Sequence, residues 1–292
     1  MALEAKRMKR LIVALLTAGL FTVAHAEDKA LLYQVSGKDL AQPSYLYGTF
    51  HLVCPADLKI TDTIQKALAE TKQLYLEIDF DDPSLQSNML QGMMLGGGKT
   101  LKDYMKADDF TLLDAYLKRN LGNGLGQLGG LQPIALLSAM YITLMKCQPA
   151  SYDLTFAELA GKGGKEVLGL ETIQEQLAVL GKVPIEQQLE GLVEMARRPD
   201  EAGKELSDLI AAYKAQDLDL LMKLMRESKF DSDTKGFEDE ILDKRNQNWI
   251  PIIEKAAHDR STFFAFGAAH LAGEKGVVNL LRAKGYTVKP LP

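Results

Sequence analysis

The 292-residue sequence lacks the short motifs of several large protein classes. It contains no HExxH and no GxSxG segment, which excludes the helical zinc-peptidase site and the serine nucleophile of the α/β-hydrolases. No CxxC pair is present, so a structural zinc knuckle is also excluded. The glycine run Gly96–Thr100 is not a phosphate-binding loop, because Met93 stands where the first glycine is needed and no strand precedes it.

Long apolar runs are also lacking beyond the N-terminal end of the chain. Residues 1–26 have the organisation of a signal peptide: basic residues at positions 6–10, an apolar stretch from Leu11 to Val23, and a small-x-small site at Ala24–Ala26. We expect cleavage after Ala26 and export to the periplasm or the medium, without stable membrane insertion afterwards. An uncleaved N-terminal anchor is the alternative. A lipoprotein anchor is not expected, because no cysteine follows the site.

Basic charge is in deficit after this segment. Removing its four basic residues and one acidic residue from the totals of 34 and 39 leaves 30 and 38, a net charge near −8 for residues 27–292. An acidic surface argues against nucleic acid and against anionic lipid as partners. The remaining chain is long enough for one large domain, and we expect a peptide or small-molecule substrate. Nothing in the sequence indicates an oligomeric state.

Cysteine is scarce, with Cys54 and Cys147 the two in the chain. In an exported protein the expected state of such a pair is a disulfide. Closing so long a loop would add about 4–5 kcal/mol to stability in the chain-entropy view. The alternative is that Cys54 is a nucleophile next to His51, three residues before it.

Hydrophobic periodicity predicts an α/β (α+β) fold. Short apolar, β-rich runs predict strands over 31–35, 45–51, 73–80, 166–170, 262–266 and 286–289. The first two form a hairpin signal, and a helix over Thr61–Glu70 precedes the third. Helical spacing dominates the middle of the chain, with a helical insert at about 83–161 and further helices over 184–195, 205–216, 217–225, 237–257 and 273–284. We therefore expect a single domain over 27–292, with a central mixed sheet built from the N- and C-terminal segments.

Two segments far apart in the chain share one pattern. Residues 44–52 read SYLYGTFHL and residues 262–271 read TFFAFGAAHL, each an apolar run that ends in Gly-x-x-His-Leu. His51 and His270 would thus lie at the ends of strands, at the edge of the sheet. Paired imidazoles there favour metal ligation or acid–base chemistry in one shared site. The alternative is that each ring merely satisfies a backbone partner near the core.

Several further polar residues are candidates for the same site. Glu77 lies within the apolar run QLYLEIDF, where a carboxylate is costly unless it is paired, metal-bound or at an accessible edge. Glu171 ends a strand and directly precedes the capping box Thr172-x-x-Glu175, so its alternative role is to complement the helix dipole. Asp153 is expected to cap the helix 154–160.

The predicted helix over 237–257 carries two more candidates. Arg245 and Asn246 are candidates for binding substrate or orienting a carboxylate, and Asp153 is kept with them in that role. Arg245 and Trp249 are four residues apart, so their side chains can stack. The alternative is a purely structural pair.

Together these segments resemble the TraB/GumN family. The resemblance rests on GTFH at 48–51, YLEIDF, GKEVLGLETIQEQ, RNQNW and the closing FAFGAAHLAGEKGVVNLLRAKGYTV, and it covers nearly all of residues 27–292 in the right order. It implies a fold related to erythromycin-esterase-like and ChaN-like proteins. It also implies that His51, His270 and Glu77 form the catalytic or metal site, with Glu171, Arg245 and Asn246 in support. The family includes metal-dependent proteases, whereas the two cysteines are not part of its pattern.

The sequence therefore predicts an exported metal-dependent hydrolase, with a peptidase as the first expectation. His51, Glu77 and His270 would bind a divalent ion such as Mn²⁺, Co²⁺ or Zn²⁺, and Glu171 would accept a proton. One alternative is a metal-free hydrolase of the esterase type, in which histidine and glutamate activate water directly. The other is a ligand- or heme-binding protein that uses the same cleft without turnover.

Overall fold

A computed structural model of the chain describes residues 29–230 and 236–292. The predicted signal peptide, residues 1–26, lies outside the described residues. Across the described ranges, no helix is long and apolar enough to cross a membrane.

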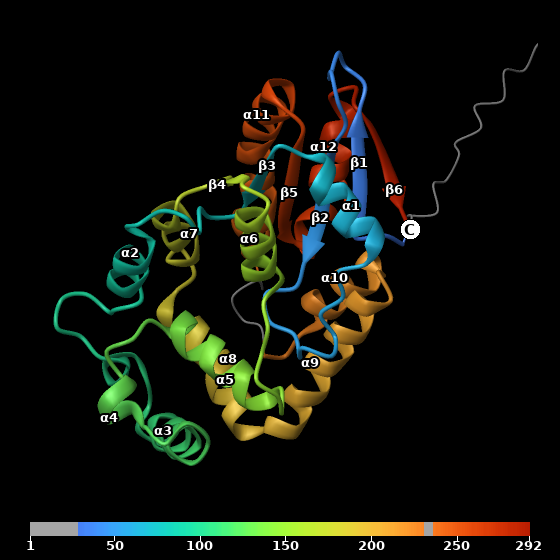
Figure 1. The fold of residues 1–292 in the computed structure, drawn as a ribbon. Coiled ribbons are helices and arrows are strands. Elements are labelled where there is room, and N and C mark those ends of the chain that lie inside the picture. Colours follow the sequence, from blue (N-terminus) through green and yellow to red (C-terminus); the bar gives the residue numbers. More distant parts are fainter. Residues whose placement is uncertain (1–28, 231–235) are drawn as a thin grey trace, which may run out of the picture.

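Six strands form one mixed sheet in the order β4-β3-β5-β2-β1-β6 (Figure 1). Strand β5 lies between β2 and β3 and is parallel to both, and β4 is parallel to β3. Strand β1 is antiparallel to β2 and to β6, so the predicted hairpin and the central mixed sheet are both confirmed. The strands are β1 (Leu32–Ser36), β2 (Ser44–Thr49), β3 (Gln73–Leu76), β4 (Glu166–Gly169), β5 (Thr262–Gly267) and β6 (Thr287–Leu291).

The four parallel strands determine where the site can be. Strands β2, β3, β4 and β5 run in one direction, so their carboxyl ends lie at the same edge of the sheet. Such an edge is where ligands bind in open α/β sheets. The segments that follow these strands carry His51, Glu77, Glu171 and His270.

The central strands are apolar because both faces of the sheet are covered. Phe263 and Phe266 of β5 are fully buried, and each gains about 2–3 kcal/mol from burial. The Phe263 ring packs on Phe156 of α6 (Tyr152–Lys162), and the Phe266 ring packs on Trp249 of α11 (Lys244–Asp259). Residues an odd number apart in a strand point to opposite faces, so α6 and α11 cover opposite faces of the sheet.

The remaining helices form the flanks of the sheet and a separate helical region beyond its carboxyl edge (Figure 1). They are α1 (Asp62–Glu70), α2 (Leu85–Gly92), α3 (Ala107–Leu121), α4 (Leu125–Leu128), α5 (Pro133–Leu144), α7 (Ile173–Leu180), α8 (Ile185–Arg197), α9 (Pro199–Lys214), α10 (Leu218–Glu227) and α12 (Val277–Ala283). Short helical turns are η1 (Leu101–Tyr104), η2 (Asp239–Asp243, a π turn) and η3 (Ala268–Leu271).

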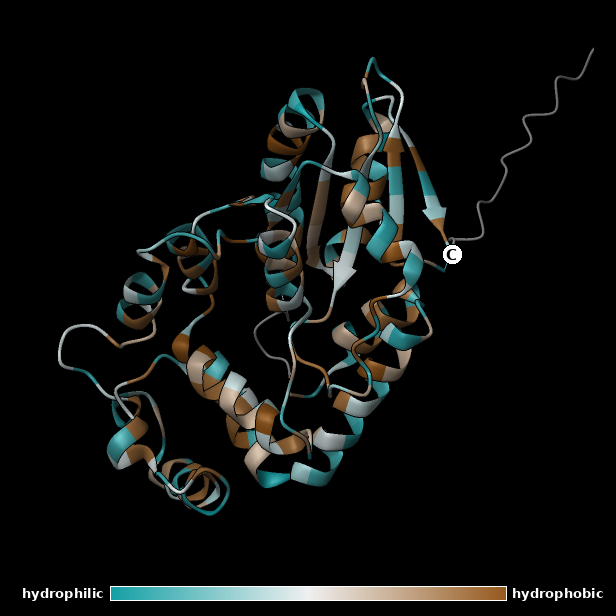
Figure 2. Ribbon diagram, in the orientation of Figure 1, coloured by the Kyte–Doolittle hydropathy of each residue, from teal (hydrophilic) through white to brown (hydrophobic). Residues whose placement is uncertain are grey.

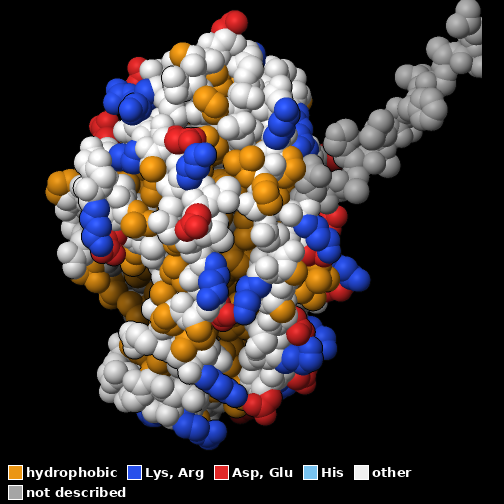
Figure 3. All heavy atoms as spheres, turned by 45° about the vertical axis from the view of Figure 1, so that its right-hand side comes forward, with side chains coloured by type: hydrophobic (Ala, Val, Ile, Leu, Met, Phe, Trp, Pro, Cys, Tyr) orange, Lys and Arg blue, Asp and Glu red, His pale blue; other side chains and the backbone are white. Residues whose placement is uncertain are grey.

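Two hydrophobic cores correspond to these two regions. One surrounds the sheet, and the other joins α3, α5 and α8 through residues such as Leu113, Leu136 and Leu192. Apolar residues accordingly concentrate on the inward faces of the helices (Figure 2). In the space-filling view, hydrophobic side chains gather between the upper part, which carries the sheet, and the lower helices (Figure 3).

Two local expectations need correction, and a third is confirmed in more detail. The strand expected over 73–80 ends at Leu76, so Glu77 follows β3 and does not lie within it. The cap of α6 is Ser151, whose hydroxyl accepts from the Leu154 N–H, so the predicted capping role of Asp153 is wrong. The long helix expected over 237–257 is confirmed: it begins as the π turn η2, and α11 continues through Pro251 to Asp259.

Candidate functional site

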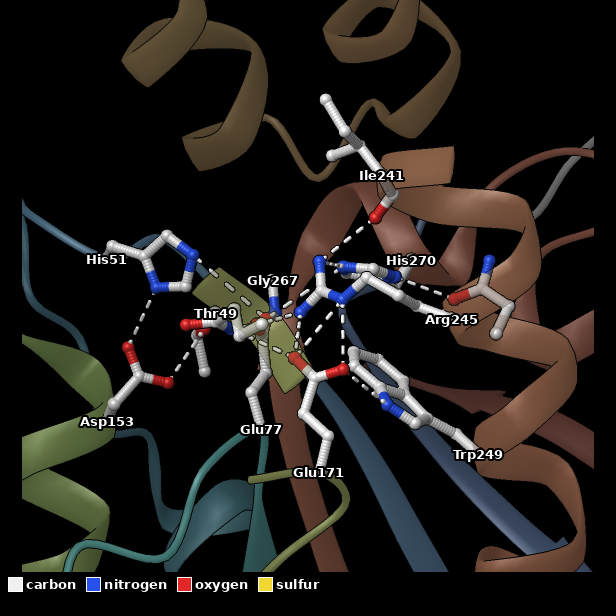
Figure 4. A network of polar contacts seen from close by, with 12 residues as sticks. Thr49, His51, Glu77, Asp153, Glu171, Ile241, Arg245, Trp249, Gly267 and His270 are labelled. Carbon is white, nitrogen blue, oxygen red and sulfur yellow. Dashed lines mark hydrogen bonds and ion pairs between the residues drawn. The ribbon is translucent and has the colours of Figure 1, made fainter. Parts of the chain in front are cut away.

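The carboxyl edge of the sheet gathers a network of polar side chains (Figure 4). Its centre is Glu77, which is 6% exposed. Glu77 Oε1 accepts from the Gly267 N–H at 2.7 Å, and Oε2 accepts from Arg245 Nη2 at 2.7 Å and from Gln176 Nε2 at 3.0 Å. Burial acts to raise the pKa of Glu77, but the charges of Arg245 and of the neighbouring histidines and the hydrogen bond from Gly267 hold that pKa well below its ordinary value. Glu77 is therefore an ionised, fixed carboxylate.

Arg245 uses every nitrogen of its guanidinium. Nη2 donates to Glu77 and to Glu171 Oε1 at 2.6 Å, and Nε donates to Glu171 at 3.1 Å. Nη1 donates to the Ile241 carbonyl at 2.9 Å and to His270 Nε2 at 3.1 Å. The guanidinium also lies over the Trp249 ring, 4.8 Å from its centre, as the spacing of four residues predicts. Loss of either carboxylate would leave part of this buried positive charge unpaired, which would destabilise the site.

Glu171 is saturated with donors. Besides Arg245, it accepts from Gln176 Nε2 at 3.0 Å and from Trp249 Nε1 at 3.3 Å. Burial raises the pKa of Glu171, although the hydrogen bonds from Arg245 act in the opposite direction. The geometry places this carboxylate behind Arg245, as its support.

His270 is 3% exposed and has both ring nitrogens occupied. Arginine can only donate, so Nε2 accepts from Arg245 and the ring proton is on Nδ1, which donates to Asn246 Oδ1 at 2.6 Å. Asn246 in turn donates to the Lys275 carbonyl at 3.0 Å, and the Trp249 ring is 4.4 Å away. Burial and the charge of Arg245 lower the pKa of His270 to about 3, so this ring is neutral.

His51 lies in a different environment. Its side chain is 67% exposed, and its Nδ1 is 3.2 Å from Asp153 Oδ2. Asp153 Oδ1 accepts from the Thr49 hydroxyl at 3.1 Å, which fixes the carboxylate against the end of β2. The other ring nitrogen, Nε2, is 4.0 Å from Glu77 Oε1. Partial removal from water acts to lower the pKa of His51, but the hydrogen bond to Asp153 and the charge of Glu77 raise it above its ordinary value.

The glycines of the two GxxH segments let neighbouring side chains approach the backbone closely. A methyl group on Gly48 would lie 2.7 Å from the Leu271 side chain and 3.0 Å from Ala268 of the second segment. A methyl group on Gly267 would lie 3.2 Å from Glu77 Oε1 and 3.6 Å from His51 Nε2. Gly48 therefore permits close packing, whereas the missing side chain of Gly267 leaves a small space bordered by Glu77 Oε1, His51 Nε2 and His270 Cδ2.

This space suits a cation in two respects. Glu77 and His51 offer it an oxygen and a nitrogen, and Asp153 accepts from the far nitrogen of His51, which is the usual support of a metal-bound histidine. Three carboxylates, Glu77, Asp153 and Glu171, also outnumber the two cations, the Arg245 guanidinium and the His51 ring, whose pKa is raised to about 9. The residues at Gly267 thus fit a weakly held divalent ion with His51 and Glu77 as protein ligands.

His270 does not fit as a third ligand in this arrangement. Its Nε2 also lies 4.0 Å from Glu77 Oε1, but the lone pair of Nε2 accepts from Arg245. Accordingly, no cluster of three or more His, Cys, Asp or Glu side chains that could hold a metal occurs within residues 29–230 and 236–292. His270 could join a metal only if Arg245 moved away.

Comparison with known proteins agrees with the resemblance. A model of the TraB/PrgY/gumN family matches residues 31–290. The chain belongs to this family. Among curated relatives, metalloprotease TIKI2 of Xenopus tropicalis is 24% identical over 86% of this chain and 58% of its own length. Metalloprotease TIKI1 of Danio rerio is 24% identical over 86% of this chain and 61% of its own length, and human TIKI1 is 23% identical over 86% and 60%.

The chain thus spans about three fifths of the length of these relatives. No solved structure matches it.

The structure brings all the candidate site residues into one network: His51, Glu77, Asp153, Glu171, Arg245, Asn246 and His270. His258 lies apart, with its ring on the Tyr286 hydroxyl at 3.1 Å. Sequence reasoning missed Thr49, Gln176 and Gly267 as members. Thr49 and Gly267 stand inside the two GxxH segments, and Gln176 stands one residue after the capping glutamate. Their closeness to these motifs was the signal that could have identified them. The expected disulfide between Cys54 and Cys147 is confirmed.

Proposed function

We propose that this chain is an exported, metal-dependent hydrolase of peptide bonds. The observation that carries the proposal is the convergence of His51 Nε2 and Glu77 Oε1 on the open space at Gly267. Membership of a family whose similar members are named metalloproteases supports the peptide substrate and the metal. The disulfide supports export to an oxidising compartment.

His51 and Glu77 would hold the ion, which can be Mn²⁺, Co²⁺ or Zn²⁺. When bound, such an ion supplies a Lewis acid at the sheet edge. Asp153 accepts the Nδ1 proton of His51 and so directs the lone pair of Nε2 toward the open space. The Gly267 N–H and Arg245 hold Glu77 in the ionised form that a cation requires.

The remaining residues position this pair. Arg245 carries a permanent charge beside Glu77, and Glu171, Gln176 and His270 fix the guanidinium and Glu77 in place. Glu171 was the expected proton acceptor. Because its oxygens already accept from Arg245, Gln176 and Trp249, we assign it to positioning Arg245 instead.

The test uses residues 27–292, stripped of metal and then supplied separately with Mn²⁺, Co²⁺ or Zn²⁺. Cleavage of a mixed peptide library is followed by mass spectrometry. We expect cleavage that returns with one of the ions and is lost in His51→Ala and Glu77→Gln. Cleavage by His51→Ala at the wild-type rate would overturn the assignment.

One observation favours a second candidate, a metal-free hydrolase. The His51–Asp153 pair has the arrangement of an oriented acid–base group, and Arg245 already supplies a positive charge next to Glu77. In that case hydrolysis of peptides or esters survives exhaustive chelation but still requires His51. The chelation arm of the same experiment separates the two candidates.

A further inference from the structure

Two loops that carry the open half of the site are joined by a ladder of contacts. The first loop follows β2 and contains His51, and the second connects α5 to α6 and leads to Asp153. The Cys54–Cys147 disulfide is the outermost contact between them. Val53 and Ala150 form an isolated antiparallel bridge, with N–H···O distances of 2.9 and 2.7 Å. The hydrogen bond of His51 to Asp153, at 3.2 Å, is the innermost contact.

The two sides of this ladder are not equally anchored. Asp153 lies in the first turn of α6, whose residues Tyr152 and Phe156 are 2% and 0% exposed against the sheet core. Thr49 at the end of β2 also binds it. Asp153 is therefore held by the core itself.

His51 has no comparable anchor. It lies in irregular chain beyond the end of β2, and its side chain is 67% exposed. On its N-terminal side the fixed points are Thr49, buried at the end of β2, and Phe50, whose ring packs on Tyr213. On the other side they are Val53, which is fully buried in the bridge, and Cys54 in the disulfide. The placement of the His51 ring over the space at Gly267 therefore depends on β2 on one side and, on the other, on what fastens this loop to its neighbour.

Sequence separation makes the cross-link important here. The cysteines are 93 residues apart, so without the disulfide the two loops are joined covalently only through a long segment. With it, His51 is three residues from one end of the cross-link and Asp153 is six residues from the other. A short covalent path through the disulfide then connects the two partners of the hydrogen bond, and it restricts how far they can separate.

We propose that the Cys54–Cys147 disulfide positions the His51–Asp153 pair, and that its role is to hold the open half of the site in register as well as to stabilise the fold. The link from this positioning to hydrolysis rests on the proposed function. A purely stabilising cross-link would instead change the melting temperature without changing the His51 ring.

The test compares Cys54→Ser/Cys147→Ser with Leu113→Ala, both made in residues 27–292. Leu113 is fully buried in the second core, so its variant loses stability without touching either loop. The readouts are the affinity for Mn²⁺ by calorimetry, the imidazole signals of His51 by NMR, and kcat and KM. All are taken at a temperature where both variants are folded.

We expect the double variant to bind Mn²⁺ at least about tenfold more weakly and to lose the hydrogen-bonded Nδ1–H signal of His51, with kcat lowered about tenfold and KM changed less than about twofold. Leu113→Ala should change none of these. If the serine pair does not fold, Cys54→Val/Cys147→Ala, which fills the space of the sulfur atoms, is measured in the same way.

Unchanged Mn²⁺ affinity and an unchanged His51 signal in the folded double variant would overturn the positioning role. A His51→Ala control separates this result from a failure of the proposed function. If His51→Ala abolishes Mn²⁺ binding and cleavage while the double variant keeps both, the function stands and the positioning role falls. If His51→Ala keeps cleavage, the function falls, and the His51 signal alone decides on positioning.

Discussion

The two histidines that end the repeated segments lie in opposite environments. The His51 side chain is 67% exposed and has one nitrogen facing an open space, whereas His270 is 3% exposed and has both nitrogens bound by side chains. Their local sequences are alike, and both follow parallel strands that end at the same edge. The shared pattern therefore determines where the backbone goes, and the packing partners determine what each ring can do.

The difference has a simple physical origin. The second segment turns toward α11, which supplies Arg245, Asn246 and Trp249 and leaves no ring nitrogen of His270 free. The first segment runs into a loop beside α6, where Asp153 binds one nitrogen of His51. One half of the site is thus fixed and buried, and the other half is exposed to solvent.

The largest effect is expected for the exposed histidine, His51, whose removal should lower activity and leave stability nearly unchanged. His51→Ala should lower the rate of peptide cleavage by about 10²–10⁴-fold, because the proposed function assigns the ion to this ring. The melting temperature should change little, since an exposed ring contributes little to packing. Cleavage assays and thermal melts check both, with His258→Ala, an exposed histidine outside the site, as the control. Loss of folding in His51→Ala would contradict the division into two halves.

The next effect tests the buried half. Arg245→Met should cost about 3–5 kcal/mol of unfolding free energy, because it leaves the buried carboxylates Glu77 and Glu171 without their cation. Urea denaturation measures it, and Lys244→Met, at the exposed neighbouring position, is the control. A loss below about 1 kcal/mol, the value of a surface ion pair, would mean that the network is not a scaffold.

A smaller effect is expected at the support of His51. Asp153→Asn should weaken Mn²⁺ binding and cleavage by about 10–100-fold, because an amide supports the ring less well than a carboxylate. The fold should remain, since Asn can still bind the Thr49 hydroxyl. Calorimetry with the metal-free protein measures the affinity. Equal affinities of the variant and the wild type would show that the orientation of His51 does not depend on Asp153.

The smallest effect concerns the protonation of His270. Its pKa is lowered to about 3 in the folded chain, whereas in the unfolded chain histidine titrates at about 6.5. The unfolded chain therefore binds a proton first as the pH falls below about 6.5, and stability is lost in that direction. Between pH 7.5 and 5.5 the wild type should lose about 1.4 kcal/mol more than His270→Gln.

His270→Gln is suitable for this comparison because its amide oxygen can still accept from Arg245. Urea denaturation at several pH values, in the presence of a chelator, gives the two stability curves. Parallel curves would mean that His270 titrates normally in the folded protein.

Much of the fold could be predicted from the sequence because its signals are local. Alternating or continuous apolar runs located all six strands, and Gly37 with Pro43 indicated the hairpin. The capping box at Thr172 located the start of α7. Glu77 could be singled out because a carboxylate next to an apolar strand needs a partner.

The partners within the site were not local and so could not be predicted. An Asp near the start of a helix reads as a cap, but Ser151 fills that role and Asp153 binds His51, 102 residues away. The bond of Gln176 to Glu77 spans 99 residues, and the bond of Arg245 to His270 depends on how α11 packs. Two segments with the same local pattern therefore gave no sign that one histidine would be buried and the other exposed.

The most direct test is a titration of ¹⁵N-histidine-labelled protein with Zn²⁺, followed by NMR and assigned with the His51→Ala and His258→Ala variants. Zn²⁺ is diamagnetic, so the ring nitrogens of each histidine can be followed to saturation. The account predicts a saturable shift of His51 Nε2, with the Nδ1–H signal of His270 unchanged because Arg245 holds that ring. Shifts of equal size at both histidines, or no shift at His51, would contradict it.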